Sequence, residues 1–321
     1  MILLVTGAMG HLGYEIARQA VAQGHEVVAV YRDELRDDDA RALGPNVKWR
    51  ACELTDAAAV TALACQHQID TCVHAAAISN EAYARPNPID AIASNVGATA
   101  NLLDAARVAK WQRFVFVSTG SVFQKRTDTG GPIFEDATPQ PANIYSTTKF
   151  SAELLTRMYR TEFGLSASTV RISWVFGPPV VSESPARGPI PSYLLRALRG
   201  ETISEGGGDF AASFTYIADA AAGLLAAAVA PQLRFDTYHL GHGVNFTARQ
   251  AGDAVRKLFP GVNISLGAGA EPWTKYTAIR GPLAGTRLRD DTGFELTHTL
   301  DQGIAAYAAW MHANPAAWRE P

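Results

Sequence analysis

The first thirteen residues constrain the fold of this chain more than any other stretch. Residues 2–5 form an apolar run typical of a buried strand, and glycines follow at positions 7, 10 and 13. Apolar residues at helical spacing then continue to Val21. A strand, a glycine-rich turn and a helix in this order predict the dinucleotide-binding start of an α/β doubly wound parallel sheet.

Each glycine of this turn has a predicted task. Gly7 permits the tight turn, Gly10 lets a pyrophosphate approach the backbone, and Gly13 lets the helix pack closely. His11 and Leu12 stand at the helix N-terminus, where free N–H groups and the positive end of the dipole attract phosphate. The spacing is G-x-x-G-x-x-G rather than the general fingerprint. The alternative is a plain strand, turn and helix without a ligand.

Composition excludes several other classes of protein. The 321 residues carry a net charge of −3 and no long basic run, which argues against nucleic-acid binding. No apolar stretch is long enough to span a membrane. Three cysteines without C-x-x-C spacing, and His239 with His242 as loop residues, predict neither disulfides nor a metal site. We therefore expect a cytoplasmic protein.

Strands and helices are predicted to alternate along the first half of the chain. Expected strands are residues 26–31, 47–51, 71–74, 113–117 and 167–173, and expected helices are 57–67, 89–109 and 145–163. Farther on, strands are expected at 213–217 and 235–240 and helices at 190–199, 219–230, 247–258 and 299–311. We predict a nucleotide-binding Rossmann domain of residues 1–175 plus about 213–240. About 176–212 and 241–321 would form a discontinuous, mostly helical substrate lobe.

The end of the second strand bears on the choice of cofactor. An acidic residue there would bind the ribose hydroxyls and select NAD, but the position holds Tyr31, and Arg32 follows. A guanidinium at this point pairs with a 2′-phosphate, which favours NADP within an NAD(P) site. Asp33 offers a ribose contact instead, and a solvated Arg32 is the alternative without function.

The ends of the third and fourth strands supply further predicted cofactor contacts. Glu53 and Leu54 are expected to cover the adenine, with the carboxylate accepting from its amine. Ala75, Ala76 and Ala77 have small side chains, so the end of their strand can lie flat beside the cofactor.

Thr119, Tyr145 and Lys149 form the predicted catalytic group. Tyr145 and Lys149 are four residues apart on one expected helix and project from the same face. A tyrosine has a pKa of about 10, and lowering it to about 7 takes roughly 4 kcal/mol, which a nearby ammonium and an oxidised nicotinamide can supply. Thr119 would hold the substrate oxygen against the phenol, and Lys149 would also bind the nicotinamide ribose. The alternative is an exposed tyrosine with a lysine one helical turn away.

Together these motifs resemble the extended short-chain dehydrogenases/reductases, the NAD-dependent epimerase/dehydratase family. The resemblance rests on residues 6–13, 74–77, 95–99, 117–123, 145–149, 171–178 and 216–221, with 288–294 and 300–304 near the C-terminus. It implies a Rossmann domain with a smaller C-terminal lobe and a homodimer formed through helices 89–109 and 145–163. It also implies Asn95 and Ile172 as further cofactor contacts and places Thr119 at the catalytic Ser/Thr position.

Departures from the family pattern bear on the substrate. Family dehydratases carry an Asp-Glu pair after the catalytic threonine, but Gly120 and Ser121 stand here, so dehydration is not expected. Trp174 replaces an asparagine that often touches the sugar nucleotide, and an arginine expected just before residues 214–216 is missing. Ser121, Trp174 and Arg280 are the predicted substrate contacts, with Arg280 binding a phosphate or a carboxylate.

Three functions follow from these features. The first is an oxidoreductase that transfers hydride to or from a sugar-like hydroxyl or carbonyl and releases its cofactor; its substrate is a polyol, a sugar acid, a ketone or a nucleotide sugar. The second is a nucleotide-sugar 4-epimerase that keeps its cofactor. The third, from another class, is a non-catalytic NADP-sensing scaffold.

Overall fold

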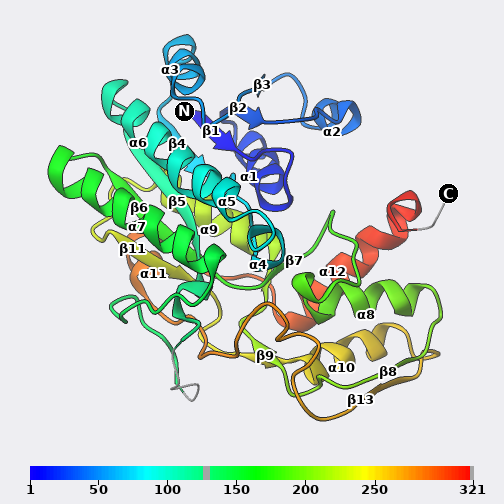
Figure 1. Cartoon of the computed structure of the whole chain (residues 1–321). Coiled ribbons are helices and arrows are strands. Elements are labelled where there is room, and N and C mark those ends of the chain that lie inside the picture. Colours follow the sequence, from blue (N-terminus) through cyan, green and yellow to red (C-terminus); the bar gives the residue numbers. More distant parts are fainter. Residues whose placement is uncertain (126–130, 319–321) are drawn as a thin grey trace.

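A seven-stranded parallel sheet forms the centre of the computed structural model, which describes residues 1–125 and 131–318. The strand order is β11-β6-β5-β4-β1-β2-β3 (Figure 1). The bounds are β1 Ile2–Thr6, β2 Glu26–Tyr31, β3 Val47–Ala51, β4 Thr71–His74, β5 Arg113–Thr119, β6 Ala167–Ile172 and β11 Thr237–Leu240. The Rossmann-type architecture predicted from the sequence is confirmed.

Helices cover both faces of this sheet. One apolar core lies under α1 (His11–Ala22), α9 (Ile217–Val229) and α11 (Arg287–Thr292). The other lies under α3 (Ala57–Gln66), α6 (Ala98–Val108) and α7 (Ile144–Phe163). Because both faces are covered, the central strands β1, β4 and β5 are buried along almost their whole length, whereas the edge strand β3 is partly exposed.

The helix expected at residues 89–109 is divided into three parts. Pro88–Ile92 is α5, Ala93–Gly97 is a π-helical turn, and α6 follows. Two short helices complete this half of the molecule, α2 (Asp37–Ala42) and α4 (Glu81–Ala84).

A second, smaller lobe lies beside the carboxyl ends of the strands (Figure 1). It contains α8 (Pro189–Leu198), α10 (Ala248–Leu258), α12 (Leu300–Ala313) and three two-stranded sheets. The pairs are β8 (Ile203–Glu205) with β13 (Ile264–Leu266), β9 (Ala211–Ala212) with β12 (Phe246–Thr247), and β7 (Val175–Phe176) with β10 (Thr215–Tyr216). Tyr193, Phe210, Trp273 and Tyr307 are among its buried side chains.

The structure departs from the sequence-based expectations in three further places. The strand expected at 213–217 is reduced to residues 215–216, which pair with β7 and not with the central sheet. Leu288, Phe294 and Leu296, expected in the second lobe, pack instead on the core beneath α9 and β11, whose apolar surface they cover. His239, expected as a loop residue although the strand expected at 235–240 includes it, is buried within β11, so the strand expectation is the correct one. The exact lobe boundaries stay a prediction.

Two further findings concern the described residues only. None of their helices is long and apolar enough to cross a membrane. No group of three or more His, Cys, Asp or Glu side chains among them is arranged to hold a metal ion.

Candidate active site at the carboxyl ends of the strands

The glycine turn lies between β1 and β4, where the strand order reverses. Gly7 has a φ of +66°, and a Cβ there would lie 2.9 Å from the Ala76 Cα. At Gly13 a Cβ would lie 2.2 Å from the Gly7 carbonyl oxygen, so α1 packs directly on the turn. Gly10 is the N-cap of α1 and offers no capping side chain. The first turn of α1 therefore keeps N–H groups for a ligand, as a pyrophosphate requires.

Two cavities meet at this turn. The first has a volume of about 390 Å³ and the second about 570 Å³. Gly7, Gly10, Ala76 and Ala77 line both. A dinucleotide with its pyrophosphate at this shared wall would place one nucleoside in each cavity, so the residues present fit NAD(P).

The second cavity contains the residues predicted for the adenosine end. Arg32, Asp33, Glu53 and Leu54 all line it. Arg32 donates from Nε to both Asp33 carboxylate oxygens at 2.9 Å and from Nη2 at 2.7 Å, and both side chains are exposed. One carboxylate oxygen of Glu53 accepts from the Thr55 amide and hydroxyl, which leaves its other oxygen for a ligand.

Asn95 does not line either cavity. Its side chain is buried, accepts from the Ile78 amide at 2.8 Å, and donates to the Ile78 carbonyl and the Thr148 hydroxyl. The Asn95 side chain therefore links the loop after β4 to α7. This position behind the cavity wall differs from the cofactor contact predicted for Asn95. Ala75 and Ile172, in contrast, line the first cavity.

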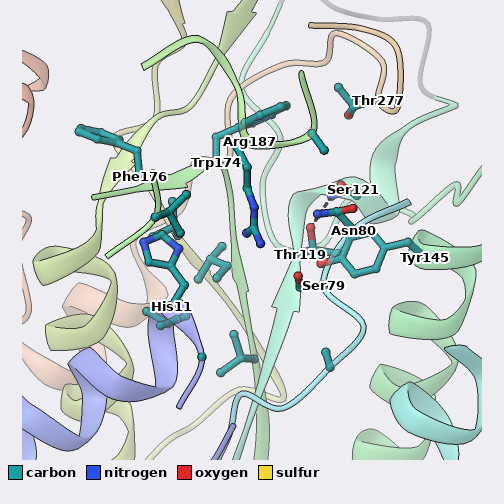
Figure 2. Close-up of a pocket in the computed structure, with 18 of the residues that line it drawn as sticks. His11, Ser79, Asn80, Thr119, Ser121, Tyr145, Trp174, Phe176, Arg187 and Thr277 are labelled. Atoms are coloured by element: carbon teal, nitrogen blue, oxygen red, sulfur yellow. Dashed lines mark hydrogen bonds between the residues drawn. The ribbon is translucent and has the colours of Figure 1, made fainter. Parts of the chain in front are cut away.

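The three predicted catalytic residues line the first cavity together. Thr119 ends β5, and its hydroxyl accepts from the Ser121 amide at 3.1 Å. Asn143 caps α7, so Tyr145 lies in the first turn of that helix and Lys149 in the next. Figure 2 shows the Tyr145 phenol directed toward Thr119.

Burial and neighbouring charges set the proton affinities at this site. Burial raises the pKa of Tyr145, and interactions with the Thr119 hydroxyl and the Arg280 guanidinium oppose that rise. Burial lowers the pKa of Lys149 to about 7, and the Glu153 carboxylate opposes this. In the protein alone, Arg280 is therefore a cation that acts on the phenol and that the sequence did not single out for this effect. The effect of Lys149 on the pKa of Tyr145 stays a prediction.

A buried ion pair lies next to the elements that carry the catalytic residues. Arg171 and Glu153 are almost fully buried and lie 2.6 Å apart, Nη2 to Oε2. The Ser118 hydroxyl, next to Thr119, donates to Glu153 Oε1 at 2.5 Å. Glu153 lies one helical turn after Lys149. Sequence reasoning missed it, although its spacing of four residues from Lys149 was a usable signal.

The substrate side of the cavity holds all three predicted contacts, Ser121, Trp174 and Arg280. Trp174 has a φ of +37°, which is a strained conformation for a residue with a large side chain. Its ring packs closely on Gly188, because a Cβ added to Gly188 would lie only 2.7 Å from the ring. The sequence did not single out Arg187. It extends into the cavity near His11 and Trp174 (Figure 2).

His11 is neutral in this environment. Its Nε2 lies 3.0 Å from the Gly177 carbonyl oxygen. Burial and the positive charge of Arg187 lower its pKa to about 4. At neutral pH the imidazole thus adds no charge, and Arg187 is the cation on this side of the cavity.

Comparison with known proteins identifies relatives along most of the chain. A profile described as the NAD dependent epimerase/dehydratase family matches residues 3–241. A trifunctional UDP-glucose 4,6-dehydratase/UDP-4-keto-6-deoxy-D-glucose 3,5-epimerase/UDP-4-keto-L-rhamnose-reductase of Arabidopsis thaliana is 29% identical over 229 residues, 68% of this chain and 34% of that protein. A dTDP-glucose 4,6-dehydratase of Streptomyces griseus is 27% identical over 339 residues, 99% of this chain and 96% of its own.

Among solved structures, the UDP-glucose 4-epimerase of Thermotoga maritima with UDP-glucose superposes with a TM-score of 0.86. The two chains are 20% identical, and the match covers 98% of this chain and 100% of that one. This likeness concerns the fold alone. The chain spans about a third of the length of the Arabidopsis enzyme. Because dehydratases are among the relatives, the exclusion of dehydration made from Gly120 and Ser121 is not supported.

Proposed function

The chain belongs to the NAD-dependent epimerase/dehydratase family, and on that premise we propose that it transfers hydride to or from a sugar-like hydroxyl or carbonyl. One observation carries this proposal. Thr119, Tyr145 and Lys149 line the same cavity as Gly7 and Gly10. A substrate alcohol that is hydrogen-bonded to the Thr119 and Tyr145 hydroxyls can therefore lie next to a dinucleotide bound at the glycine turn.

The protein's part of the reaction is to bind the substrate oxygen and to move its proton. In the oxidative direction Thr119 orients the hydroxyl, and the Tyr145 phenolate takes its proton as the carbonyl forms. The bound NAD(P)⁺ supplies the acceptor for the hydride that leaves the same carbon. Lys149 is proposed to bind the nicotinamide ribose. In the reductive direction the Tyr145 phenol returns the proton.

Release or retention of the cofactor separates this proposal from the runner-up. Purified protein is mixed with NAD⁺ or NADP⁺ and a panel of sugar acids, polyols and nucleotide sugars, and reduced nicotinamide is followed by absorbance. Steady accumulation supports a dehydrogenase. Conversion of a UDP-sugar to its epimer without accumulation supports the nucleotide-sugar 4-epimerase, the activity of the Thermotoga relative. Loss of water to give a 4-keto-6-deoxy sugar would instead indicate a dehydratase. Cofactor binding with no turnover of any substrate would favour the sensing scaffold.

Arg32 is proposed to favour NADP over NAD. Replacing Arg32 with alanine should weaken NADP⁺ binding by about 10- to 100-fold, because a charge-assisted hydrogen bond to the 2′-phosphate is lost. NAD⁺ binding should change little, since the side chain is exposed and its ion pair, within the part of the chain that the structure describes, is with the neighbouring Asp33. Fluorescence titration of both cofactors measures this ratio. Asp33→Ala is the matched control and should favour NADP⁺, because it frees the guanidinium. Equal loss of both cofactors in Arg32→Ala would remove Arg32 from the 2′-phosphate site.

A homodimer is proposed to form through the outer helices α5, α6 and α7. Ile89, Ile92, Val108, Leu154 and Phe163 are large apolar side chains that are exposed on these helices. Leu154→Glu should therefore shift the protein toward a monomer, as measured by light scattering after gel filtration. Leu258→Glu, at an exposed leucine of α10, is the control and should leave the mass unchanged. A Leu154→Glu protein with unaltered mass would place the interface elsewhere.

A further inference from the structure

Among the described residues, Arg280 is a buried cation without an acidic partner. Its side chain is 7% exposed and lines the first cavity. Its two hydrogen bonds both start at Nη1 and go to neutral acceptors, the Thr277 hydroxyl at 3.2 Å and the Ala278 carbonyl at 3.4 Å. Within residues 1–125 and 131–318 no carboxylate pairs with it, and Nε and Nη2 have no hydrogen-bond partner. A buried guanidinium left in this way is costly unless a ligand supplies the anion.

The position of Arg280 locates that anion next to the reacting carbon. Burial lowers the pKa of Arg280 to about 10, and interaction with the ionised form of Tyr145 opposes this shift. Gly120 provides the necessary space, since a Cβ there would lie 3.4 Å from Arg280 Nε and 3.3 Å from the Leu283 side chain. The guanidinium therefore lies beside Gly120, the residue after Thr119, and within electrostatic reach of Tyr145.

We propose that Arg280 binds a carboxylate carried by the substrate close to the carbon that exchanges hydride, so that the substrate is a sugar acid, free or nucleotide-linked. This inference rests on the proposed function. A planar guanidinium with two unpaired nitrogen groups matches the two oxygens of a carboxylate. The other arginine that lines this cavity, Arg187, lies toward His11 and the glycine turn and remains available for phosphate.

Matched pairs of substrates test the proposal. Each pair consists of a sugar acid and its neutral counterpart, such as glucuronate with glucose and UDP-glucuronate with UDP-glucose. The wild-type protein should prefer the acid in at least one pair. Arg280→Met should lower kcat/KM for that acid by at least about 100-fold, because it removes the partner of a buried charge, and should lower it far less for the neutral sugar. Arg41→Met, an exposed arginine outside both cavities, removes the same charge and should leave both values unchanged.

Binding experiments separate failure of this inference from failure of the proposed function. Calorimetry with NAD⁺-loaded wild-type protein should detect the acid and its loss in Arg280→Met, even if no hydride is transferred. Arg280→Lys should bind the acid more tightly than Arg280→Met and more weakly than the wild type, since lysine restores the positive charge but not the planar pair of nitrogen donors. Acid binding that survives in Arg280→Met, or equal preference of the wild type for acid and neutral sugar, would overturn the carboxylate site. Acid binding that needs Arg280 without any turnover would overturn only the hydride transfer.

The pH profile gives a second readout on Arg280. Its positive charge lowers the pKa of Tyr145. Oxidation requires the phenolate, so kcat/KM should rise with pH, and in Arg280→Met the rise should move to higher pH. If Arg280 had only a structural role, the pH at which kcat/KM rises would be the same in Arg280→Met as in the wild type.

Discussion

Replacing Tyr145 with phenylalanine is expected to lower kcat by roughly 10²–10⁴-fold, the usual contribution of a positioned acid–base group. The change removes one oxygen atom and keeps the ring, so the packing of α7 and the cavity wall stays the same. The dissociation constant for NAD(P) should remain within about threefold of the wild-type value, because the glycine turn and Lys149 are untouched.

Tyr159→Phe is the matched control for this experiment. Tyr159 is on the same helix but outside both cavities. Single-turnover formation of reduced nicotinamide with saturating substrate measures the chemical step, and fluorescence titration measures cofactor binding. A Tyr145→Phe protein that turns over like the Tyr159→Phe control would remove Tyr145 from the chemistry.

The second large effect is expected on stability. Glu153→Gln leaves Arg171, which is 1% exposed, without its counter-charge, and breaking a buried pair in this way costs about 3–5 kcal/mol. Urea unfolding at equilibrium should show this loss. The carboxylate also raises the pKa of Lys149, so its removal should lower that pKa further and leave less ammonium at neutral pH.

An exposed ion pair provides the comparison. Asp104 and Arg107 on α6 are 51% and 41% exposed. Asp104→Asn should cost only about 0–1 kcal/mol, as is usual for surface pairs. If Glu153→Gln costs no more than Asp104→Asn, the buried pair does not stabilise the fold. The double variant Glu153→Gln with Arg171→Met should then recover part of a large loss, because both charges are gone.

The framework of the fold was predictable because local patterns determine it. The bounds of β2, β3 and β4 match the strands expected from the sequence, and the helix expected at 57–67 is α3, which Asp56 caps through its carboxylate. Tyr145 and Lys149 share one helical face wherever that helix lies. These features depend on residues only a few positions apart, which the sequence displays directly.

The electrostatics of the site depend on tertiary contacts and were not predictable. Arg280 reaches Tyr145 from a segment more than a hundred residues away, through the space left at Gly120. Arg187 lies in a proline-containing segment whose sequence gives no sign that its side chain lines the cavity. Asn95 bonds to the Ile78 backbone, a contact that forms only in the folded chain. The same applies to residues 288–296, because the apolar surface of α9 and β11 that they cover exists only after folding.

The repeated passage of the chain between the two lobes limits how the enzyme can open. The backbone passes from the sheet into the smaller lobe after β6 and β11 and returns before α9 and α11. Asp219 on α9 further binds the amides and side chains of Thr297 and His298 as the chain leaves for α12. Because several segments connect the lobes, rotation of one lobe would require all of these connections to bend together. We expect ligand entry through small loop movements, with scattering curves that coincide for the free and cofactor-bound protein; a clear compaction on binding would contradict this.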